Sequence, residues 1–219
     1  MGILNNNWNK QEKEPMLSKM KGKINSQPPM KHQIESTQRS LQAMIAKLDQ
    51  KCLGLKSQDD GLFNKIVTAT QKHETDRASA YANELAEVRK MNKMVTQSKL
   101  ALEQIALRLN TVSELGDVVV TLTPAMGVIR DIQSGVMNIL PEAEHEISEI
   151  NGLLSGILVD AGQIEGHNIN FENSNVESRQ IMDEASAIAD EKMKEQFPDL
   201  PSAADSLLPK KNKIEGLFE

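Results

Sequence analysis

The stretch LFNKIVTATQKHETDRASAYANELAEVRKMNKMVTQSKLALEQIALRLNTVSEL, residues 62–115, contains neither glycine nor proline. Because proline breaks helices and glycine weakens them, nothing in this stretch interrupts helical structure. A helix of about 50 residues would be ~75 Å long at 1.5 Å per residue. One face carries an apolar residue at every seventh position: Tyr81, Val88, Val95, Leu102 and Leu109. This repeat predicts a helix that packs lengthwise against a second helix.

A matching apolar stripe precedes this stretch. Its members also recur every seven residues: Ile34, Leu41, Leu48 and Leu55. We predict a helix from Met30 to Lys56, joined to the longer helix through GLKSQDDG, Gly54–Gly61, in an antiparallel hairpin. In this arrangement the later helix extends beyond the earlier one. The uncovered part of its apolar stripe then needs a further partner.

Shorter helices are expected after the hairpin. The segment 116–161 is typical of two amphipathic helices, with Pro124 and Pro141 near their starts. Within it, Val118–Leu122 is rich in β-branched residues, but a lone strand would have no pairing partner, so we predict helix. The predicted fold class is therefore all-α: a long antiparallel helical hairpin plus shorter C-terminal helices, with flexible ends.

These elements divide the chain into five predicted parts. They are an N-terminal membrane-proximal tail at 1–28, a helical core at 29–162 (hairpin 30–112, shorter helices 116–161), a Gly- and Asn-rich linker at 163–177, a C-terminal regulatory helix at 178–196 and a tail at 197–219.

Composition limits the class of protein. Only 3% of the 219 residues are aromatic and 26% are charged, which argues against a large globular core. Cys52 is the single cysteine, so an internal disulfide is excluded. No apolar run approaches the roughly 20 residues of a spanning helix, and Met1–Trp8 lacks the apolar region of a signal peptide. We expect a cytoplasmic protein that is not integral to a membrane.

Charge is distributed unevenly along the chain. Residues 1–100 carry 17 of the 25 lysines and arginines and 10 of the 31 aspartates and glutamates, a net charge of +7. Residues 101–219 carry the remainder, a net charge of −13. The basic part can bind an anionic surface, and the acidic part can mask it. Two ordinarily solvated helical surfaces explain the charge equally well.

Four segments carry a family resemblance. They are PPMKHQIESTQRSLQAMIAKLDQ (28–50), YANELAEVRKM (81–91), SKLALEQIALRL (98–109) and VMNILPEAEHEISEINGLLSGILVDAG (136–162). In these segments and their spacing the chain resembles the archaeal cell-division ESCRT-III proteins, the CdvB family. The resemblance covers roughly residues 28–162.

The resemblance implies a function and a set of partners. It implies a membrane-remodelling polymer subunit that acts in cell division, on the inner face of the membrane at the division site. The partners would be further copies of the chain, ESCRT-III paralogues, anionic lipids and a CdvC-like AAA ATPase with an MIT domain, which dismantles the polymer. No cofactor is implied. A membrane-stress scaffold of the same superfamily is the alternative within this architecture.

Polymer contacts are expected on the uncovered stripe of the long helix. The residues predicted for this interface are Tyr81, Val88, Met91, Val95 and Leu102.

Membrane contacts are expected at the N-terminus. In a helical projection Met1, Leu4 and Trp8 fall on one side, and tryptophan suits the interface between lipid tails and headgroups. The residues predicted to bind the membrane are Met1, Ile3, Leu4, Trp8, Lys10, Lys13, Lys19, Lys21 and Lys23. The alternative is a disordered terminus with a stray tryptophan. Residues 9–62 lack aromatic side chains, so lipid phosphates are a better anionic partner than nucleic acid.

The tail carries the sequence FPDLP, residues 197–201. Its prolines keep it extended, which suits a groove between helices that accepts alternate apolar side chains. It resembles an MIT-interacting motif, with Phe197 and Leu200 as anchors and Pro198 and Pro201 as a rigid frame. The alternative is a disordered end that only stops the preceding helix.

A short motif in the chain also matches one class of enzyme. Glu142 and His145 have the Glu-x-x-His spacing of helical di-iron bundles, but such sites need a second copy of the motif and two more carboxylates. None of the other three histidines has a glutamate three residues before it. We therefore predict a solvated acidic surface here, no catalytic or metal site and no enzyme; a metal-binding oxidase is the alternative.

Overall fold

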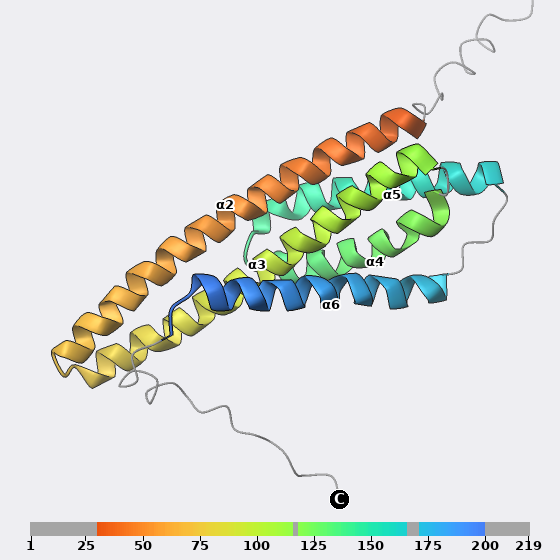
Figure 1. The fold of residues 1–219 in the computed structure, drawn as a ribbon. Coiled ribbons are helices and arrows are strands. Elements are labelled where there is room, and N and C mark those ends of the chain that lie inside the picture. Colours follow the sequence, from red (N-terminus) through yellow and green to blue (C-terminus); the bar gives the residue numbers. More distant parts are fainter. Residues whose placement is uncertain (1–29, 116–117, 166–170, 200–219) are drawn as a thin grey trace, which may run out of the picture.

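The computed structural model describes residues 30–115, 118–165 and 171–199 (Figure 1). The regular elements within these ranges are helices, which agrees with the predicted all-α class. They are α2 (Met30–Gln71), α3 (Thr75–Leu115), α4 (Val118–Val136), the short 3-10 helix η1 (Pro141–Ala143), α5 (Glu144–Glu165) and α6 (Phe171–Gln196).

The first two helices form the predicted antiparallel hairpin and pack along their lengths (Figure 1). The apolar stripe of α2 does not stop at Leu55, because Leu62 and Ala69 continue it at the same seven-residue interval and are buried. Packing against α3 therefore holds α2 helical through Gly54 and Gly61. A Cβ atom built at either glycine would meet nothing within 4 Å. The prediction of a turn at 54–61 is wrong.

The turn lies instead at residues 72–74. His73 has a φ of 57°, in the left-handed region, and its N–H donates to the carbonyl oxygen of Thr70 at 3.0 Å. The N–H of Glu74 donates to the carbonyl oxygen of Ala69 at 2.9 Å, which completes a Schellman motif. Helices α2 and α3 consequently have 42 and 41 residues, so neither overhangs the other.

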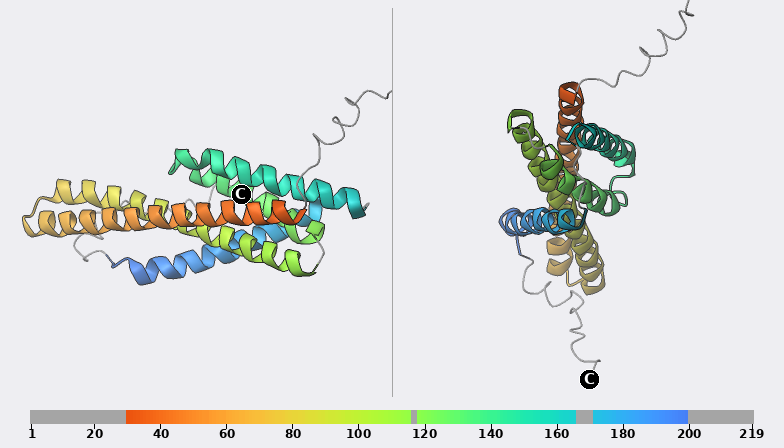
Figure 2. Two further views of the ribbon diagram at one scale, coloured as in Figure 1. Left: turned by 90° about the horizontal axis from the view of Figure 1, so that it is seen from above. Right: turned by 90° about the vertical axis from the view of Figure 1, so that its right-hand side faces the viewer.

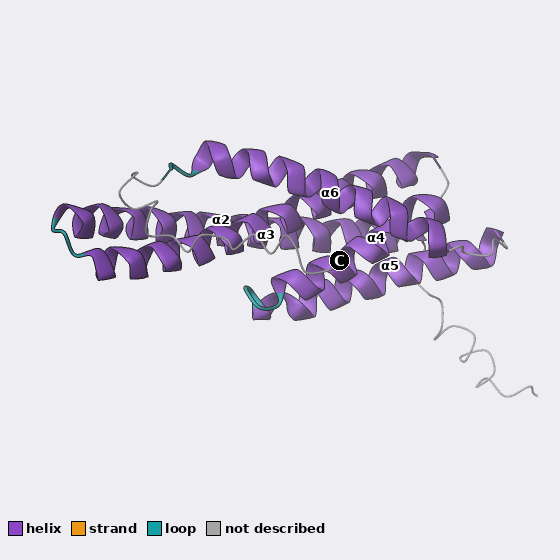
Figure 3. Ribbon diagram, turned by 90° about the horizontal axis from the view of Figure 1, so that it is seen from below, coloured by secondary structure: helices purple, strands orange, loops and turns teal. Residues whose placement is uncertain are grey.

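The remaining helices pack on two sides of the hairpin. Helix α5 lies against α2 and α4, whereas α6 lies against α3 and α4 (Figures 1 and 2). The segment 118–122 is helical, as predicted. Because α5 continues to Glu165 and α6 begins at Phe171, helix enters both ends of the predicted linker at 163–177. The turn end of the hairpin projects past the other helices (Figure 3).

A single apolar cluster joins the described helices. It runs from Ile34 in α2 to Ala189 in α6 and includes buried side chains of α3, α4 and α5. Helix α3 contacts α2, α4 and α6, and α4 contacts α3, α5 and α6, so these two helices connect the hairpin to the later helices. No helix within the described ranges is long and apolar enough to cross a membrane.

Candidate functional site

Most predicted membrane and docking residues lie outside the described ranges. The N-terminal membrane set falls within residues 1–29, and Leu200 and Pro201 follow the last described residue. Of the predicted tail motif, Phe197 and Pro198 are described. The candidate site is therefore the surface where α6 and these two residues meet the hairpin.

The predicted polymer interface lies largely inside the subunit. Val88 is 5% exposed and Val95 and Leu102 are fully buried, while Tyr81 and Met91 are partly buried against the same cluster. The argument from an overhanging helix is wrong, because the hairpin arms match in length and α2, α4 and α6 cover α3. The assignment of these residues to a polymer contact stays a prediction, and it would require the subunit to open.

Helix α6 is held on α3 and α4 through a narrow apolar face. Ile181, Ala185 and Ala189 are buried there, at the spacing of one helical side. Near its start, the hydroxyl of Ser178 donates to the carbonyl oxygen of Pro124 in α4 at 2.9 Å. A Cβ atom at Gly127 would lie 2.3 Å from that hydroxyl oxygen and 2.9 Å from Ser178 Cβ, so a side chain here would force Ser178 or the helix to shift.

Polar contacts connect the same helix to α3. The Lys93 ammonium lies 2.6 Å from the Asp190 carboxylate, and the Arg108 guanidinium lies 3.7 Å from that of Glu177. Each of these four side chains is between a third and a half exposed. Solvent screening therefore keeps each pair weak, at about 0–1 kcal/mol.

Phe197 is seated at the C-terminal end of α6 by three side chains of the hairpin: Lys56 and Asp59 of α2 and Arg89 of α3. We call these three residues the Phe197 seat. The ring is 5% exposed and lies 4.8 Å from the Lys56 ammonium and 5.6 Å from the Arg89 guanidinium carbon, measured to its centroid. Both distances fit cation–π contacts.

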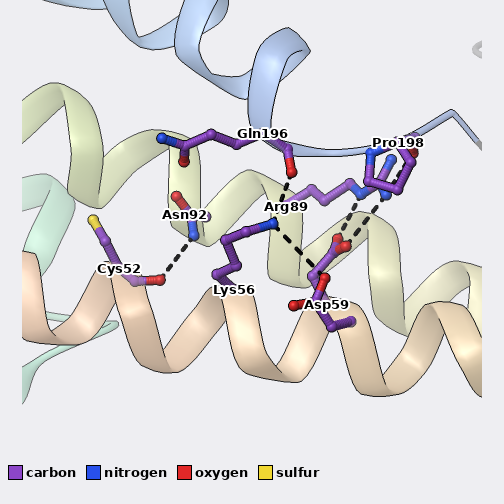
Figure 4. Close-up of polar contacts among 8 residues, drawn as sticks. Cys52, Lys56, Asp59, Arg89, Asn92, Gln196 and Pro198 are labelled. Atoms are coloured by element: carbon purple, nitrogen blue, oxygen red, sulfur yellow. Dashed lines mark hydrogen bonds and ion pairs between the residues drawn. The ribbon is translucent and has the colours of Figure 1, made fainter.

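Lys56 and Arg89 also bind the main chain at Gln196 and Pro198, the residues before and after Phe197 (Figure 4). Lys56 Nζ donates to the carbonyl oxygen of Gln196 at 2.7 Å, and an Arg89 terminal nitrogen donates to that of Pro198 at 2.9 Å. Lys56 thus caps the C-terminus of α6, where the helix dipole favours a positive charge.

Asp59 fixes Arg89 in this position. Its carboxylate is fully buried and accepts two hydrogen bonds from the guanidinium, at 2.6 and 3.3 Å. This paired geometry orients the guanidinium. Removing one member of a buried pair leaves an uncompensated charge, which is strongly destabilising. The ion pair between Asp59 and Arg89 therefore fixes the Phe197 seat within the hairpin, before Phe197 binds there.

A second polar contact fixes the hairpin arms beside the seat (Figure 4). The buried Asn92 side chain of α3 donates from Nδ2 to the carbonyl oxygen of Cys52 in α2 at 3.2 Å. Burial raises the pKa of the Cys52 thiol. The thiol therefore has less thiolate character than an exposed cysteine, which makes it a poor nucleophile.

The sequence analysis singled out Phe197 as a docking anchor, which stays a prediction, and did not identify the three residues of its seat. One signal was present: Asp59 lies four residues after Leu55 and three before Leu62, on the apolar face of α2. An acidic residue at a buried position needs a specific partner. The partner is Arg89 because of the register of the two hairpin arms. A turn placed at 54–61 predicts a different register.

The two residues of the proposed enzyme motif lie on the surface. Glu142 and His145 are exposed, in η1 and at the start of α5. Across the described residues, no group of three or more histidine, cysteine, aspartate or glutamate side chains is placed to hold a metal ion.

Comparison with known proteins identifies relatives along most of the chain. It is 38% identical to Cell division protein B1 of Sulfolobus acidocaldarius over 178 residues, which cover 81% of this chain and 83% of the relative. It is 31% identical to Cell division protein B of the same organism over 161 residues, 74% of this chain and 62% of that relative. No protein-family model matches the chain, and neither does a solved structure.

Both relatives are named for cell division, and proteins of this type are structural rather than enzymatic. The described helices have the expected ESCRT-III-like organisation. With this identity over four-fifths of its length, the chain belongs to the CdvB family of archaeal cell-division ESCRT-III proteins.

Proposed function

We propose that this chain is the subunit of a membrane-remodelling polymer that assembles on the cytoplasmic face of the membrane during cell division. The observation that carries the proposal is the position of α6 across α3 and α4. Its buried face is narrow and its charged contacts are exposed to solvent. Such a helix is suited to being displaced, which exposes an apolar surface for a second copy of the chain.

Charge supports a masking role for this helix. Helix α6 contains seven acidic and three basic residues, while α2 and α3 together contain twelve basic and nine acidic residues. In the closed subunit the net charge of α6, 3 − 7 = −4, outweighs the net charge of the hairpin, 12 − 9 = +3. Release of α6 would restore that charge and favour an anionic membrane.

Membrane attachment is proposed for the N-terminal residues Met1, Ile3, Leu4 and Trp8 and the lysines that follow. A few inserted side chains at about 1.5–3 kcal/mol each, less the entropy of ordering the segment, bind one subunit marginally. Polymerisation changes this outcome, because linked subunits bind with multiplied avidity. Assembly and membrane binding would therefore reinforce each other.

Disassembly is proposed to act through the tail motif around Phe197 and Leu200. A tail beyond the last helix can reach an MIT-domain ATPase while the hairpin remains in the polymer, and pulling on it would extract the subunit. Calorimetry with a 194–211 peptide and the MIT domain tests this. The peptide carrying Phe197→Ala and Leu200→Ala should bind at least tenfold more weakly, about 1.4 kcal/mol. Equal affinities would contradict the docking role.

Truncation tests the polymer proposal. A chain ending at Glu165 lacks α6 and the tail, whereas a control ending at Asp199 keeps α6 and its seated phenylalanine. The first should form filaments at a lower protein concentration than the full chain, and the control should match the full chain. Electron microscopy and co-sedimentation with phosphatidylglycerol or phosphatidylcholine vesicles measure both assembly and lipid preference. Identical critical concentrations for the two truncations would overturn the masking role of α6.

A further inference from the structure

Polar side chains of α2 and α3 pair with each other at intervals along the hairpin. The hydrogen-bonded pairs, which we call the cross-hairpin pairs, are Gln38–Asn110, Asp49–Lys99, Cys52–Thr96 and Asp59–Arg89. From one pair to the next, a step forward along α2 is matched by an equal step back along α3: eleven residues, then three, then seven. A single register of the two arms therefore satisfies all of these pairs.

The apolar contacts of the hairpin do not select this register by themselves. The buried stripe of α2 repeats every seven residues from Leu41 to Leu62, and that of α3 repeats every seven residues from Val88 to Leu109. If one helix slipped past the other by seven residues, apolar side chains would again lie opposite apolar side chains. Apolar burial would change mainly at the ends of the hairpin.

The turn does not select the register either. Residues 72–74 are Lys-His-Glu, and His73 adopts a left-handed conformation that residues other than glycine adopt at a cost. Because the slip is shared between the two arms, a slip of seven residues moves the turn by three or four residues, about one helical turn. Residues 62–115 contain no glycine or proline that would fix the turn at its present place.

The cross-hairpin pairs do distinguish between registers. Asp59 is fully buried and is paired with Arg89 (Figure 4). A slip of seven residues would place Asp59 opposite Thr96 in one direction and opposite Ala82 in the other. In both cases a buried carboxylate would lose its cation, which is strongly unfavourable.

We propose that the cross-hairpin pairs act as a register lock, which selects one of several alignments of α2 and α3 that the apolar stripes allow. Buried polar residues in the seam of a coiled coil can specify register in this way, at a cost in stability. The lock determines that the chain turns at residues 72–74. It also sets where the later helices attach, because α5 packs on α2, whereas α4 and α6 pack on α3. A chain with one register presents one surface to any partner.

Three leucine substitutions remove the lock without leaving a buried charge unpaired: Asp59→Leu, Arg89→Leu and Asn92→Leu. Asn92 is included because its buried side chain donates to the carbonyl oxygen of Cys52 in α2 at 3.2 Å. Replacing a buried ion pair with apolar residues is often neutral or stabilising, so the Tm of this variant should stay within about 5 °C of wild type or rise.

The matched control makes similar changes at exposed positions of the same two helices. Its substitutions are Asp60→Leu, Asn83→Leu and Lys90→Leu.

Electron paramagnetic resonance on the full chain measures the register. Nitroxide labels are attached at Gln42→Cys and Ala80→Cys, two exposed positions, in a chain that also carries Cys52→Ser. These positions are offset along the hairpin by roughly 40 Å, and a slip of seven residues changes the offset by about 10 Å. We expect one distance in the wild-type background and in the control. The leucine variant should show a second distance, shifted by about 10 Å.

The result can contradict the lock in two ways. A single distance at the wild-type value in the leucine variant would overturn it, because the apolar contacts and the later helices would then fix the register alone. Loss of folding would also overturn it, because the pairs would then hold the hairpin together and not merely select its alignment.

Exchanging two buried residues of α2 provides a second variant, Asp59→Ile with Ile66→Asp. The exchange keeps the composition and moves the carboxylate seven residues along the same face, opposite Arg89 only in a slipped register. We expect the distance between the two labels to lengthen by about 10 Å. A folded chain with the wild-type distance would overturn the lock.

Discussion

Helices α5 and α6 both lie against the hairpin, but different interactions hold them there. Along α5 the buried side chains are mostly branched: Ile147, Ile150, Leu154, Ile157, Leu158 and Ala161. Along α6 they are mostly small: Ser178, Ile181, Ala185 and Ala189. A buried leucine or isoleucine contributes about 1.5–3 kcal/mol, whereas a single methyl contributes about 0.8 kcal/mol. Helix α5 is therefore bound mainly by apolar burial.

The polar contacts show the opposite balance. Helix α5 has an ion pair between Lys47 and Glu146, a hydrogen bond from Gln33 to Asp160 and a weak one from the Ser155 hydroxyl to the Met126 sulfur. Helix α6 has two ion pairs to α3, hydrogen bonds from Gln97 and Lys56 to its main chain, and the Ser178 contact with α4. Polar and partly exposed contacts can be exchanged for water or for another protein at little cost. This difference makes α6 the releasable helix and α5 part of the core.

The largest effect is predicted for a substitution that removes apolar burial from α5. Leu154→Ala removes a fully buried side chain between α5 and its neighbours and should lower the free energy of unfolding by about 2–5 kcal/mol. For a chain of this size, Tm should fall by roughly 5–15 °C. Val159→Ala is the control, because Val159 is on the same helix and 51% exposed. A Leu154→Ala chain with wild-type Tm would show that α5 is not part of the core.

A second variant tests the release of α6. Ala185→Asp places a carboxylate at a fully buried position, where its desolvation exceeds what the narrow interface can offset. We expect α6 amides to exchange at least roughly 100-fold faster while α5 amides keep their protection, measured by hydrogen exchange. Ala187→Asp makes the same chemical change at an exposed position of α6 and should leave exchange unchanged. Loss of protection in α5 as well would show that the two helices form one cooperative unit.

The sequence predicted the hairpin but not the position of its turn. Helical packing overrides the cost of about 1 kcal/mol for each glycine, so Gly54 and Gly61 remain inside α2. The seven-residue apolar stripe continues through Leu62 and Ala69, and this periodicity was the better guide. The turn itself depends on His73 in the left-handed region, a position where glycine is usual, so composition does not reveal it.

The candidate site was predictable in part. The end of α6 just before Phe197 and Pro198 follows from local sequence, because proline ends a helix whatever lies nearby. Its seat does not, since Lys56 and Arg89 are separated from their tail partners by 140 and 109 residues. Contacts of this kind depend on how α6 crosses the hairpin, and that crossing is set by Gly127 and Ser178.

A change in ionic strength should have a smaller effect, and it should affect α6 more than α5. Raising sodium chloride from 0.05 to 0.5 M shortens the Debye length from about 14 to about 4 Å and screens the exposed pairs of α6. Exchange of α6 amides should rise about threefold or more, and that of α5 amides should change less than twofold. A chain with Glu177→Gln and Asp190→Asn should lose this salt dependence. Equal salt sensitivity of the two helices would contradict the difference between them.

The smallest effect concerns the polar contact of α5. Lys47 donates a hydrogen bond to Glu146, which lowers the pKa of that carboxyl below its ordinary value. A lowered pKa in the folded state stabilises the fold at pH values above the unfolded pKa, and this contribution is lost as pH falls through the folded value. Among the described atoms, Glu146 Oε2 is buried without a hydrogen-bond partner, which offsets part of the gain.

Glu146→Gln should therefore lower the free energy of unfolding at pH 7 by less than about 1 kcal/mol, because the pair is about one-third exposed. The difference from wild type should shrink when the pH is lowered from 7 to 2, because Glu146 becomes protonated, and so neutral like glutamine, as the pH falls through its lowered folded pKa. Thermal unfolding at the two pH values measures it, with Glu149→Gln, an exposed glutamate of the same helix, as the control. A pH-dependent loss comparable to that of Leu154→Ala would mean that charge, rather than apolar burial, holds α5 on the hairpin.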